Sequence, residues 1–418
     1  MNHKKFAIGL FMFLSAGSLS AQNSPEEKLN MAMYAIMTRY VDSVKKAEFV
    51  DKEIAHMLQQ LDPYSEYLPP VTAAANEEVL TGIPMAVPIA PGSQPMPAGE
   101  TQSVNAVSLP STVKAAYMMD KHTGYIGLSM FAEQTPQDFR DALTRLKKQG
   151  MKNLVLDIHK NGGGLVDAAV EVASEFVPAG NLVFTARGAH IPAEEFKTAN
   201  GGAFLKGRLC VLVSGETKSA AELLSGALQD WKRGVLIGTR TYGKGLIQET
   251  LPFSDGSALR ISVARYFTPK GRDIQKLHGI CPDVEVNDSA TYANEWYQLI
   301  LFSGVQRVAA SEYVRQMKSQ LQKKYKNYDD FVRRFDSSEV LKAVCHIAKD
   351  NGLNYTDEQL AQSEAFLKIQ LKALVARDLY DDDNRFYQIL HKTSSTIQRA
   401  HEIVSNAYLY HQYVNNAK

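Results

Sequence analysis

The stretch that decides the fold is residues 153–164, which read Asn-Leu-Val-Leu-Asp-Ile-His-Lys-Asn-Gly-Gly-Gly. Its first six residues are mostly aliphatic, which is typical of a short strand buried inside a sheet. The three glycines permit a tight turn, and the residues at 165–177 then predict a helix. A strand, a turn and a helix in this order are the repeating unit of a parallel sheet. The sequence therefore predicts an α/β fold.

The same succession recurs on both sides of this stretch. Before it, a strand is expected at 125–131, and a helix from 135 to 150 has apolar residues at the spacing i, i+3, i+4, i+7. The elements expected after it are a strand at 208–213, a helix at 219–230, a strand at 235–238 and a hairpin formed by 246–251 and 258–263. Residues 111–288 are therefore expected to form a core with a mostly parallel sheet.

The first 21 residues have the pattern of a secretory signal peptide. Lys4-Lys5 precede the apolar run Phe6–Leu14, and small residues follow up to Ser20 and Ala21, where cleavage is expected. The apolar run is too short to span a bilayer. The sequence therefore predicts an exported, periplasmic protein without stable membrane insertion after cleavage, with an uncleaved anchor as the alternative.

Three further regions flank the core. Residues 22–80 carry apolar residues at helical spacing and predict an N-terminal helical segment. Residues 81–110 are rich in proline, glycine and serine, a composition that favours an extended linker. Residues 289–418 predict a C-terminal helical region, which is expected to pack on the core or to form a homo-oligomer contact.

Composition excludes several classes of function. The chain has 418 residues, with 45% hydrophobic and 22% charged residues and a net charge of +1, so nothing indicates binding to nucleic acid. The cysteines Cys210, Cys281 and Cys345 are too few to pair completely, and their disulfide status stays open. The histidines and cysteines form no metal motif, so neither a metal nor an organic cofactor is expected.

Two residues of the core form a candidate catalytic pair. Ser219 follows an apolar strand-like run, and Lys244 lies between two glycines. A serine hydroxyl becomes a strong nucleophile when a neighbouring base takes its proton, and a desolvated, neutral lysine is such a base. Neither segment contains histidine, so a Ser-Lys pair fits better than a Ser-His-Asp triad. The pair predicts a serine peptidase.

Each residue also has a simpler structural explanation. Ser219 is equally explained as a helix N-cap, and Lys244 as a solvent-exposed turn residue. In the catalytic interpretation, the N–H of Ala220 and a second N–H from the glycine run bind the oxyanion. Gln248 would accept a hydrogen bond from Lys244 only if the chain bends near Gly245, because four residues of straight strand span about 13 Å.

Several segments together resemble the C-terminal processing peptidases, or tail-specific proteases, of the S41 serine peptidases. Their order and spacing agree with that family from about residue 61 to residue 286, with a break at 81–110. The segments are Leu61-Asp-Pro-Tyr-Ser-Glu-Tyr-Leu68, residues 154–164, Ser219-Ala-Ala-Glu222 with Ala227-Leu-Gln-Asp230, Tyr242-Gly-Lys-Gly-Leu-Ile-Gln248, residues 254–259, residues 264–272 and Gly279-Ile-Cys-Pro-Asp-Val284.

The resemblance implies a role for individual residues. It makes Ser219 the nucleophile, Lys244 the general base and Gln248 the residue that orients the lysine. It places the oxyanion donors on Ala220 and on the pair Gly163-Gly164, without deciding between these two glycines. It also implies a core similar to the ClpP/crotonase-like α/β fold.

The chain departs from the family's pattern in one large feature. The family normally carries a PDZ domain between the first segment and the catalytic core, and here the Pro-rich residues 81–110 occupy that place. A stretch this short cannot build the sheet edge and pocket that hold a C-terminal carboxylate. Smaller departures are Glu216-Thr-Lys218, where small residues are usual, and Gly162, where proline is usual.

These observations predict an exported serine endopeptidase that cleaves unstructured protein segments or tails. The main alternative is a catalytically silent S41-like binding or scaffold protein, although a scaffold has no need of Ser219, Lys244 and Gln248 together. An acyl-CoA enzyme of the crotonase type fits less well, because export and the Ser-Lys pair both count against it.

Overall fold

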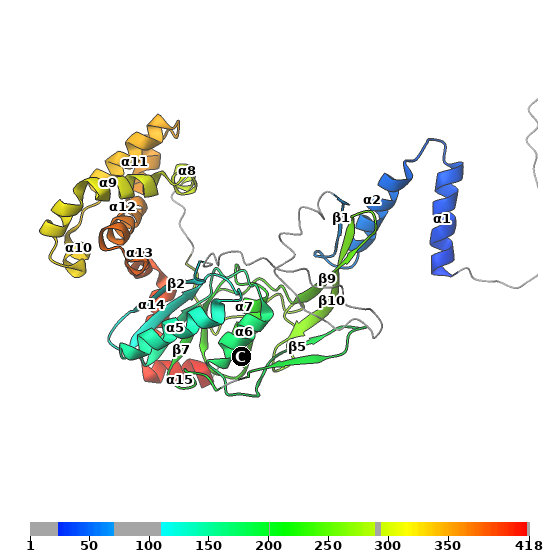
Figure 1. Cartoon of the computed structure of the whole chain (residues 1–418), viewed down its shortest axis with the longest axis horizontal. Coiled ribbons are helices and arrows are strands. Elements are labelled where there is room, and N and C mark those ends of the chain that lie inside the picture. The colour runs from blue at the N-terminus through cyan, green and yellow to red at the C-terminus, as the bar shows by residue number, and fades with distance from the viewer. Residues whose placement is uncertain (1–23, 71–109, 200, 289–293, 416–418) are drawn as a thin grey trace, which may run out of the picture.

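The computed structural model describes residues 24–70, 110–199, 201–288 and 294–415 (Figure 1). The expected signal peptide at 1–21 lies outside these residues, and so does the expected linker at 81–110 except for Pro110. Within the described residues, no helix is long and apolar enough to cross a membrane. The expected α/β fold with helical regions before and after it is confirmed (Figure 1).

A six-stranded sheet forms the centre of the core. All its neighbouring strands are parallel except the edge pair β2–β3, so the expectation of a mostly parallel sheet is confirmed. In spatial order, its strands are β11 (Val284–Glu285), β8 (Val235–Gly238), β7 (Leu209–Val213), β4 (Asn153–Asp157), β3 (Thr123–Leu128) and β2 (Val113–Met118).

Helices cover both faces of this sheet. The helices α5 (Thr135–Lys148), α6 (Val166–Ser174) and α7 (Ala220–Asp230) share one apolar cluster with Leu154 and Leu156 of β4. The helices α14 (Ser395–Ser405) and α15 (Ala407–Asn415) share another with Val155. Neighbouring residues of β4 thus point to opposite faces, as the alternation of a strand requires. The last two helices of the chain therefore complete the core and are not a separate region (Figure 1).

A second, antiparallel sheet lies beside the first. The sequence predicted only one hairpin of this sheet, formed by β9 and β10. Its strands are β1 (Glu66–Leu68), β10 (Ala258–Phe267), β5 (Leu182–Arg187), β6 (Glu194–Lys197) and β9 (Leu246–Pro252). Because β1 pairs with β10, the described part of the segment expected to be helical over 22–80 includes a strand of this second sheet.

The remaining helices form two groups. The N-terminal group is α1 (Pro25–Arg39) and α2 (Lys46–Gln59). The C-terminal group has its own apolar cluster, which includes Trp296, Phe331 and Leu371. Its members are α8 (Glu295–Ser303), α9 (Val305–Lys324), α10 (Tyr328–Arg334), α11 (Ser338–Asp350), α12 (Asp357–Tyr380) and α13 (Asp383–Leu390), followed by the short helix η1 (His391–Thr393).

Candidate active site

Ser219 lies where the chain passes from β7 into α7. It is the residue before the first helical residue and has φ 53° and ψ −119°. A non-glycine residue at positive φ is uncommon, and such strain persists only where the surroundings enforce it. The side chain is half-buried. Its position at a helix N-terminus places it beside backbone N–H groups that have no partner within the helix.

Glu222 joins the turn of Ser219 to the loop of Lys244. Its side chain is fully buried, and its Oε2 accepts the backbone N–H of Ser219 and of Lys244, each at 2.9 Å. Its Oε1 accepts the Thr241 hydroxyl at 2.6 Å and the Gly243 N–H at 2.7 Å. Burial raises the pKa of Glu222, and these four donors oppose that rise. A carboxylate surrounded by four donors ties together two segments that lie far apart in the sequence.

The two glycines beside Lys244 are required by close packing. Gly243 has φ +91°, and a Cβ there would lie 2.8 Å from the backbone N of Gly279. At Gly245 a Cβ would lie 2.5 Å from the backbone N of Gln275. Neither position tolerates a side chain without movement of backbone. The loop that carries Lys244 is therefore held firmly against the segment 274–279.

The Lys244 ammonium rests against an aromatic ring. Its Nζ lies 5.9 Å from the ring centroid of Tyr64, and the side chain is half-buried. It forms no hydrogen bond with the Ser219 hydroxyl, both residues being in the part of the chain that the structure describes. The structure thus holds the backbones of the predicted pair together, while the two reacting atoms are not in hydrogen-bond contact.

Gln248 contacts the same tyrosine. Its Nε2 donates a hydrogen bond to the backbone oxygen of Tyr64 at 2.7 Å. Lys244 precedes the first residue of β9, so the two side chains are not separated by four residues of straight strand. A bulge follows on the neighbouring strand, where Ser262 pairs with Gln248 and Ala264 with Ile247. Lys244 and Gln248 therefore each contact Tyr64, but no hydrogen bond joins the side chains of these two described residues.

The glycine turn packs directly against Ser219. A Cβ on Gly163 would lie 3.0 Å from the Ser219 Cβ and 2.9 Å from the Lys218 carbonyl oxygen. The Gly163 N–H already donates to Asn161 Oδ1 at 2.9 Å. The N–H groups of Gly164 and Ala220 have no hydrogen-bond partner among the described residues. Of the two glycines, Gly164 is thus the one with an open donor.

Lys218, beside the nucleophile, lies over another tyrosine. Its Nζ is 4.2 Å from the ring centroid of Tyr242, whose own N–H donates to the Thr217 oxygen at 3.0 Å. Burial, together with the interaction of its hydroxyl with Tyr242, raises the pKa of Tyr64. Two tyrosines therefore separate the two lysines of the site.

A polar cluster supports the end of β4, just before the glycine turn. Asp157 accepts the Tyr125 hydroxyl at 2.5 Å and the His159 ring nitrogen at 2.5 Å. Burial would raise the pKa of Asp157, but the interaction with His159 and these hydrogen bonds lower it to about 2. His159 is therefore a structural residue at the rim, and Asp157 stays ionised.

Sequence reasoning missed two residues that the site depends on. Glu222 and Tyr64 were quoted only as parts of matching segments, without a role of their own. The signal for Glu222 was an acidic residue three positions after Ser219, the spacing of a capping box. No local signal marks Tyr64, because its contact with Lys244 joins residues 180 positions apart in the sequence.

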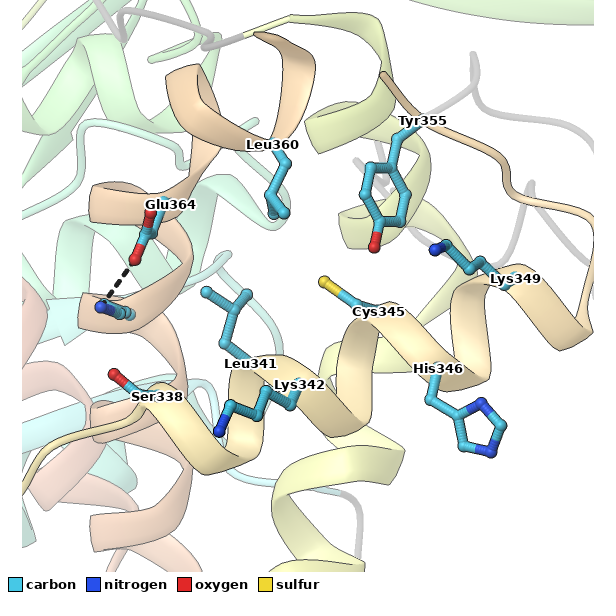
Figure 2. A pocket seen from close by; sticks show the side chains of 10 residues that line it. Ser338, Leu341, Lys342, Cys345, His346, Lys349, Tyr355, Leu360 and Glu364 are labelled. Carbon is cyan, nitrogen blue, oxygen red and sulfur yellow. Dashed lines mark ion pairs between the residues drawn. The ribbon is translucent and has the colours of Figure 1, made fainter. Parts of the chain in front are cut away.

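A cavity of about 590 Å³ lies elsewhere, between α11 and α12 (Figure 2). Its lysines Lys342 and Lys368 are already paired with Glu339 and Glu364, at 2.9 and 2.7 Å. None of the predicted site residues lines it. The three cysteines are free, and no group of three or more His, Cys, Asp and Glu is placed to hold a metal ion within the described residues.

The comparisons with known proteins concern mainly the part of the chain that carries this site. Residues 122–286 match the model of peptidase family S41, and this span contains Ser219, Lys244 and the glycine turn. This part of the chain is similar to peptidase family S41. Residues 296–381 match DUF8443, a family of unknown function.

Individual relatives of the S41 region have related names. The chain is 46% identical over 165 residues to the chloroplastic C-terminal processing peptidase of Tetradesmus obliquus. The aligned residues cover 39% of this chain and 35% of that protein. The chain is 42% identical over 160 residues to the carboxyl-terminal-processing protease of Synechocystis sp., and this alignment covers 38% of this chain and 37% of that protein. The chain thus matches about a third of the length of these relatives. A solved photosystem II D1 C-terminal processing protease is 26% identical with a TM-score of 0.45, covering 64% of this chain and 94% of that one.

Proposed function

We propose that this chain is an exported serine endopeptidase of the C-terminal processing type, with Ser219 as nucleophile and Lys244 as base. The observation that carries the proposal is the Glu222 carboxylate, which accepts the backbone N–H of both residues. It joins a strained serine at a helix N-terminus to a loop with a lysine between two packed glycines. A protein that only binds ligands has no need of this arrangement.

In the proposed mechanism, neutral Lys244 takes the proton of the Ser219 hydroxyl as its oxygen attacks the carbonyl carbon of the scissile peptide bond. The carbonyl oxygen becomes an oxyanion, which the N–H groups of Ala220 and Gly164 stabilise. Protonated Lys244 then gives its proton to the leaving amine, and the acyl group stays on Ser219. A water molecule deprotonated by Lys244 hydrolyses this ester and restores the enzyme.

The choice of Gly164 over Gly163 rests on hydrogen bonding. The Gly163 N–H already donates to Asn161, so it would have to break that bond to bind an oxyanion. Lys244 Nζ forms no hydrogen bond with the Ser219 hydroxyl, and the several rotatable bonds of the lysine side chain allow the two atoms to approach. Gln248, anchored by its amide nitrogen, keeps its carbonyl oxygen to accept a hydrogen bond from the lysine.

The proposed substrates are unstructured protein segments or tails, and the proposed location is the periplasm. Support for the substrate class comes from relatives named C-terminal processing peptidases. Support for export comes from the basic and apolar pattern of residues 1–21. A homo-oligomer through the helical regions is also proposed, since α8 exposes Phe302 and Leu299.

Labelling by a fluorophosphonate probe and hydrolysis of casein test the proposal. Wild type should show both, and Ser219→Ala should lose both while keeping its thermal unfolding temperature. Lys244→Ala should lose labelling as well, because the serine is then no longer activated. Labelling that survives in Ser219→Ala would contradict the assignment. Wild type without either activity would instead support the alternative, a catalytically silent S41-like binding or scaffold protein.

A further inference from the structure

The segment 61–68 reaches the candidate active site from outside the residues that match the S41 family. Its position is fixed by β1, which pairs with β10, and by a network around Asp62. The Asp62 carboxylate accepts the N–H groups of Tyr64 and Ser65, each at 2.8 Å. The Ser65 hydroxyl in turn accepts the N–H of Ser262 at 3.1 Å. Tyr64 is therefore held in one place against the β9–β10 hairpin.

Tyr64 contacts both residues proposed to act on the Ser219 proton. Its ring centroid lies 5.9 Å from Lys244 Nζ, and its backbone oxygen accepts the Gln248 amide at 2.7 Å. Its hydroxyl interacts with the side chains of Tyr242 and Gln275. Gln275 also accepts a hydrogen bond from Gly245, the neighbour of Lys244, at 3.0 Å. Tyr64 thus contacts the lysine through its ring and the glutamine through its backbone oxygen.

These contacts act differently on the two states of Lys244. The face of an aromatic ring attracts an ammonium group and has no comparable attraction for a neutral amine. The ring therefore favours the protonated lysine, which cannot act as a base. The Tyr64 backbone oxygen can only accept a hydrogen bond, so the Gln248 amide must donate to it through its nitrogen. The amide oxygen is then the end that remains for Lys244.

We propose that Tyr64 is a positioning residue of this site: its ring holds the Lys244 ammonium in a resting position without a hydrogen bond to Ser219, and its carbonyl orients Gln248. The inference rests on the proposed function, because it takes Lys244 as the base. The other charged or titratable groups around Tyr64 include Asp62, Tyr242, Lys218 and the buried Glu222. Replacing the Tyr64 ring also removes the contact of its hydroxyl with Tyr242, and Tyr64→Phe, which keeps the ring, measures the loss of the hydroxyl by itself.

The test compares Tyr64→Leu with wild type in the full chain. The protein is labelled with 13C at the lysine Cε, and the Lys244 signal is identified by its loss in Lys244→Arg. Removing the ring should move the midpoint of the Lys244 titration down by about half a pH unit, the shift expected for a partly exposed ammonium–ring contact. The pH at which fluorophosphonate labelling reaches half its maximal rate should move down by the same amount.

Two variants separate the ring from the rest of the segment. Tyr64→Phe keeps the ring and removes only the hydroxyl, so its midpoint should stay that of wild type. Tyr67→Leu changes a half-buried tyrosine of the same segment whose hydroxyl donates to Asp51 at 2.9 Å, and its midpoint should not move. A purely structural role of Tyr64 would lower the labelling rate at every pH without moving the midpoint.

The outcomes distinguish this inference from the proposed function. An identical Lys244 midpoint in Tyr64→Leu and wild type would overturn the inference, whatever the activity. An equal shift in Tyr67→Leu would overturn it too, because the effect would then belong to the segment as a whole. A third outcome is possible, in which the Lys244 midpoint shifts in Tyr64→Leu while labelling persists in Ser219→Ala. The placement of Lys244 by Tyr64 would then hold, and the peptidase mechanism would be rejected.

Discussion

The carboxylate of Glu222 lies 2.9 Å from the backbone nitrogen of Lys244, and the same oxygen lies 2.9 Å from that of Ser219. A single buried group therefore sets the distance between the backbones of the proposed nucleophile and base. The link runs through the main chain, so it holds while the Lys244 side chain changes its rotamer. Positioning and activation are separate in this site: Glu222 joins the segments, and Tyr64 holds the ammonium.

Glu222→Ala is expected to damage both the site and the fold. It leaves four donors without a partner in a buried place, which should lower the free energy of unfolding by about 3 kcal/mol or more. Misplacement of Ser219 should slow fluorophosphonate labelling about 100-fold. Glu171→Ala on the exposed face of α6 is the control and should change neither value. Equal labelling by Glu222→Ala and wild type would show that the carboxylate does not position the pair.

Gly163→Ala is expected to abolish activity, whereas Gly162→Ala is not. The added Cβ at Gly163 meets the Lys218 oxygen at 2.9 Å and the Ser219 Cβ at 3.0 Å, and φ is +98°. At Gly162 nothing lies within 4 Å of the added Cβ. Casein hydrolysis should thus fall at least about 100-fold in the first variant and stay near wild type in the second. Similar rates for the two variants would contradict the close packing of the glycine turn on Ser219.

Arg272→Met is expected to destabilise the core. The Arg272 guanidinium donates to Asp230 at 2.5 Å and to Gln229 at 2.8 Å, and the Asp230 side chain is fully buried. Removing one partner of a buried ion pair costs about 3–5 kcal/mol, because it leaves the other charge without compensation. Denaturant unfolding measures this change. Arg265→Met is the control. It breaks the ion pair with Asp273, in which the Arg265 side chain is 53% exposed, and it should lower the free energy of unfolding by less than about 1 kcal/mol.

His391 should make the fold sensitive to mild acid. Burial lowers the pKa of His391 to about 4, although the charge of Asp157 opposes this, and the ring contacts the Tyr117 hydroxyl at 2.7 Å. The unfolded chain binds the proton near pH 6.5, so stability is complete above that pH and is lost as pH falls toward 4. Between pH 7.5 and pH 5 the loss from this residue should be about 2 kcal/mol.

Urea unfolding at these two pH values checks the prediction. His391→Gln keeps a side-chain acceptor for Tyr117 and cannot be protonated in this range, so its stability should depend less on pH by that amount. His346, which is 79% exposed, is the control, and His346→Gln should follow wild type. The same pH dependence in His391→Gln and wild type would contradict a neutral, buried His391.

Local patterns predicted the central part of the fold well. Phe139, Leu143 and Leu146 repeat at helical spacing, and all three are fully buried on α5. The strand β6 was missed because three of its four residues are charged, and its partner β5 was missed with it. The packing of α14 on the central sheet was also missed, because the sequence of α14 does not show which surface its apolar face covers.

For the candidate site, the sequence by itself determined the chemical groups. It supplied a serine at a helix start, a lysine between two glycines and a glycine turn, because these features depend on neighbouring residues. Only the tertiary structure decided that Glu222 joins Ser219 to Lys244 and that Tyr64 receives the ammonium. The physical reason is distance along the chain: such contacts arise from the packing of separate elements, and no local periodicity encodes them.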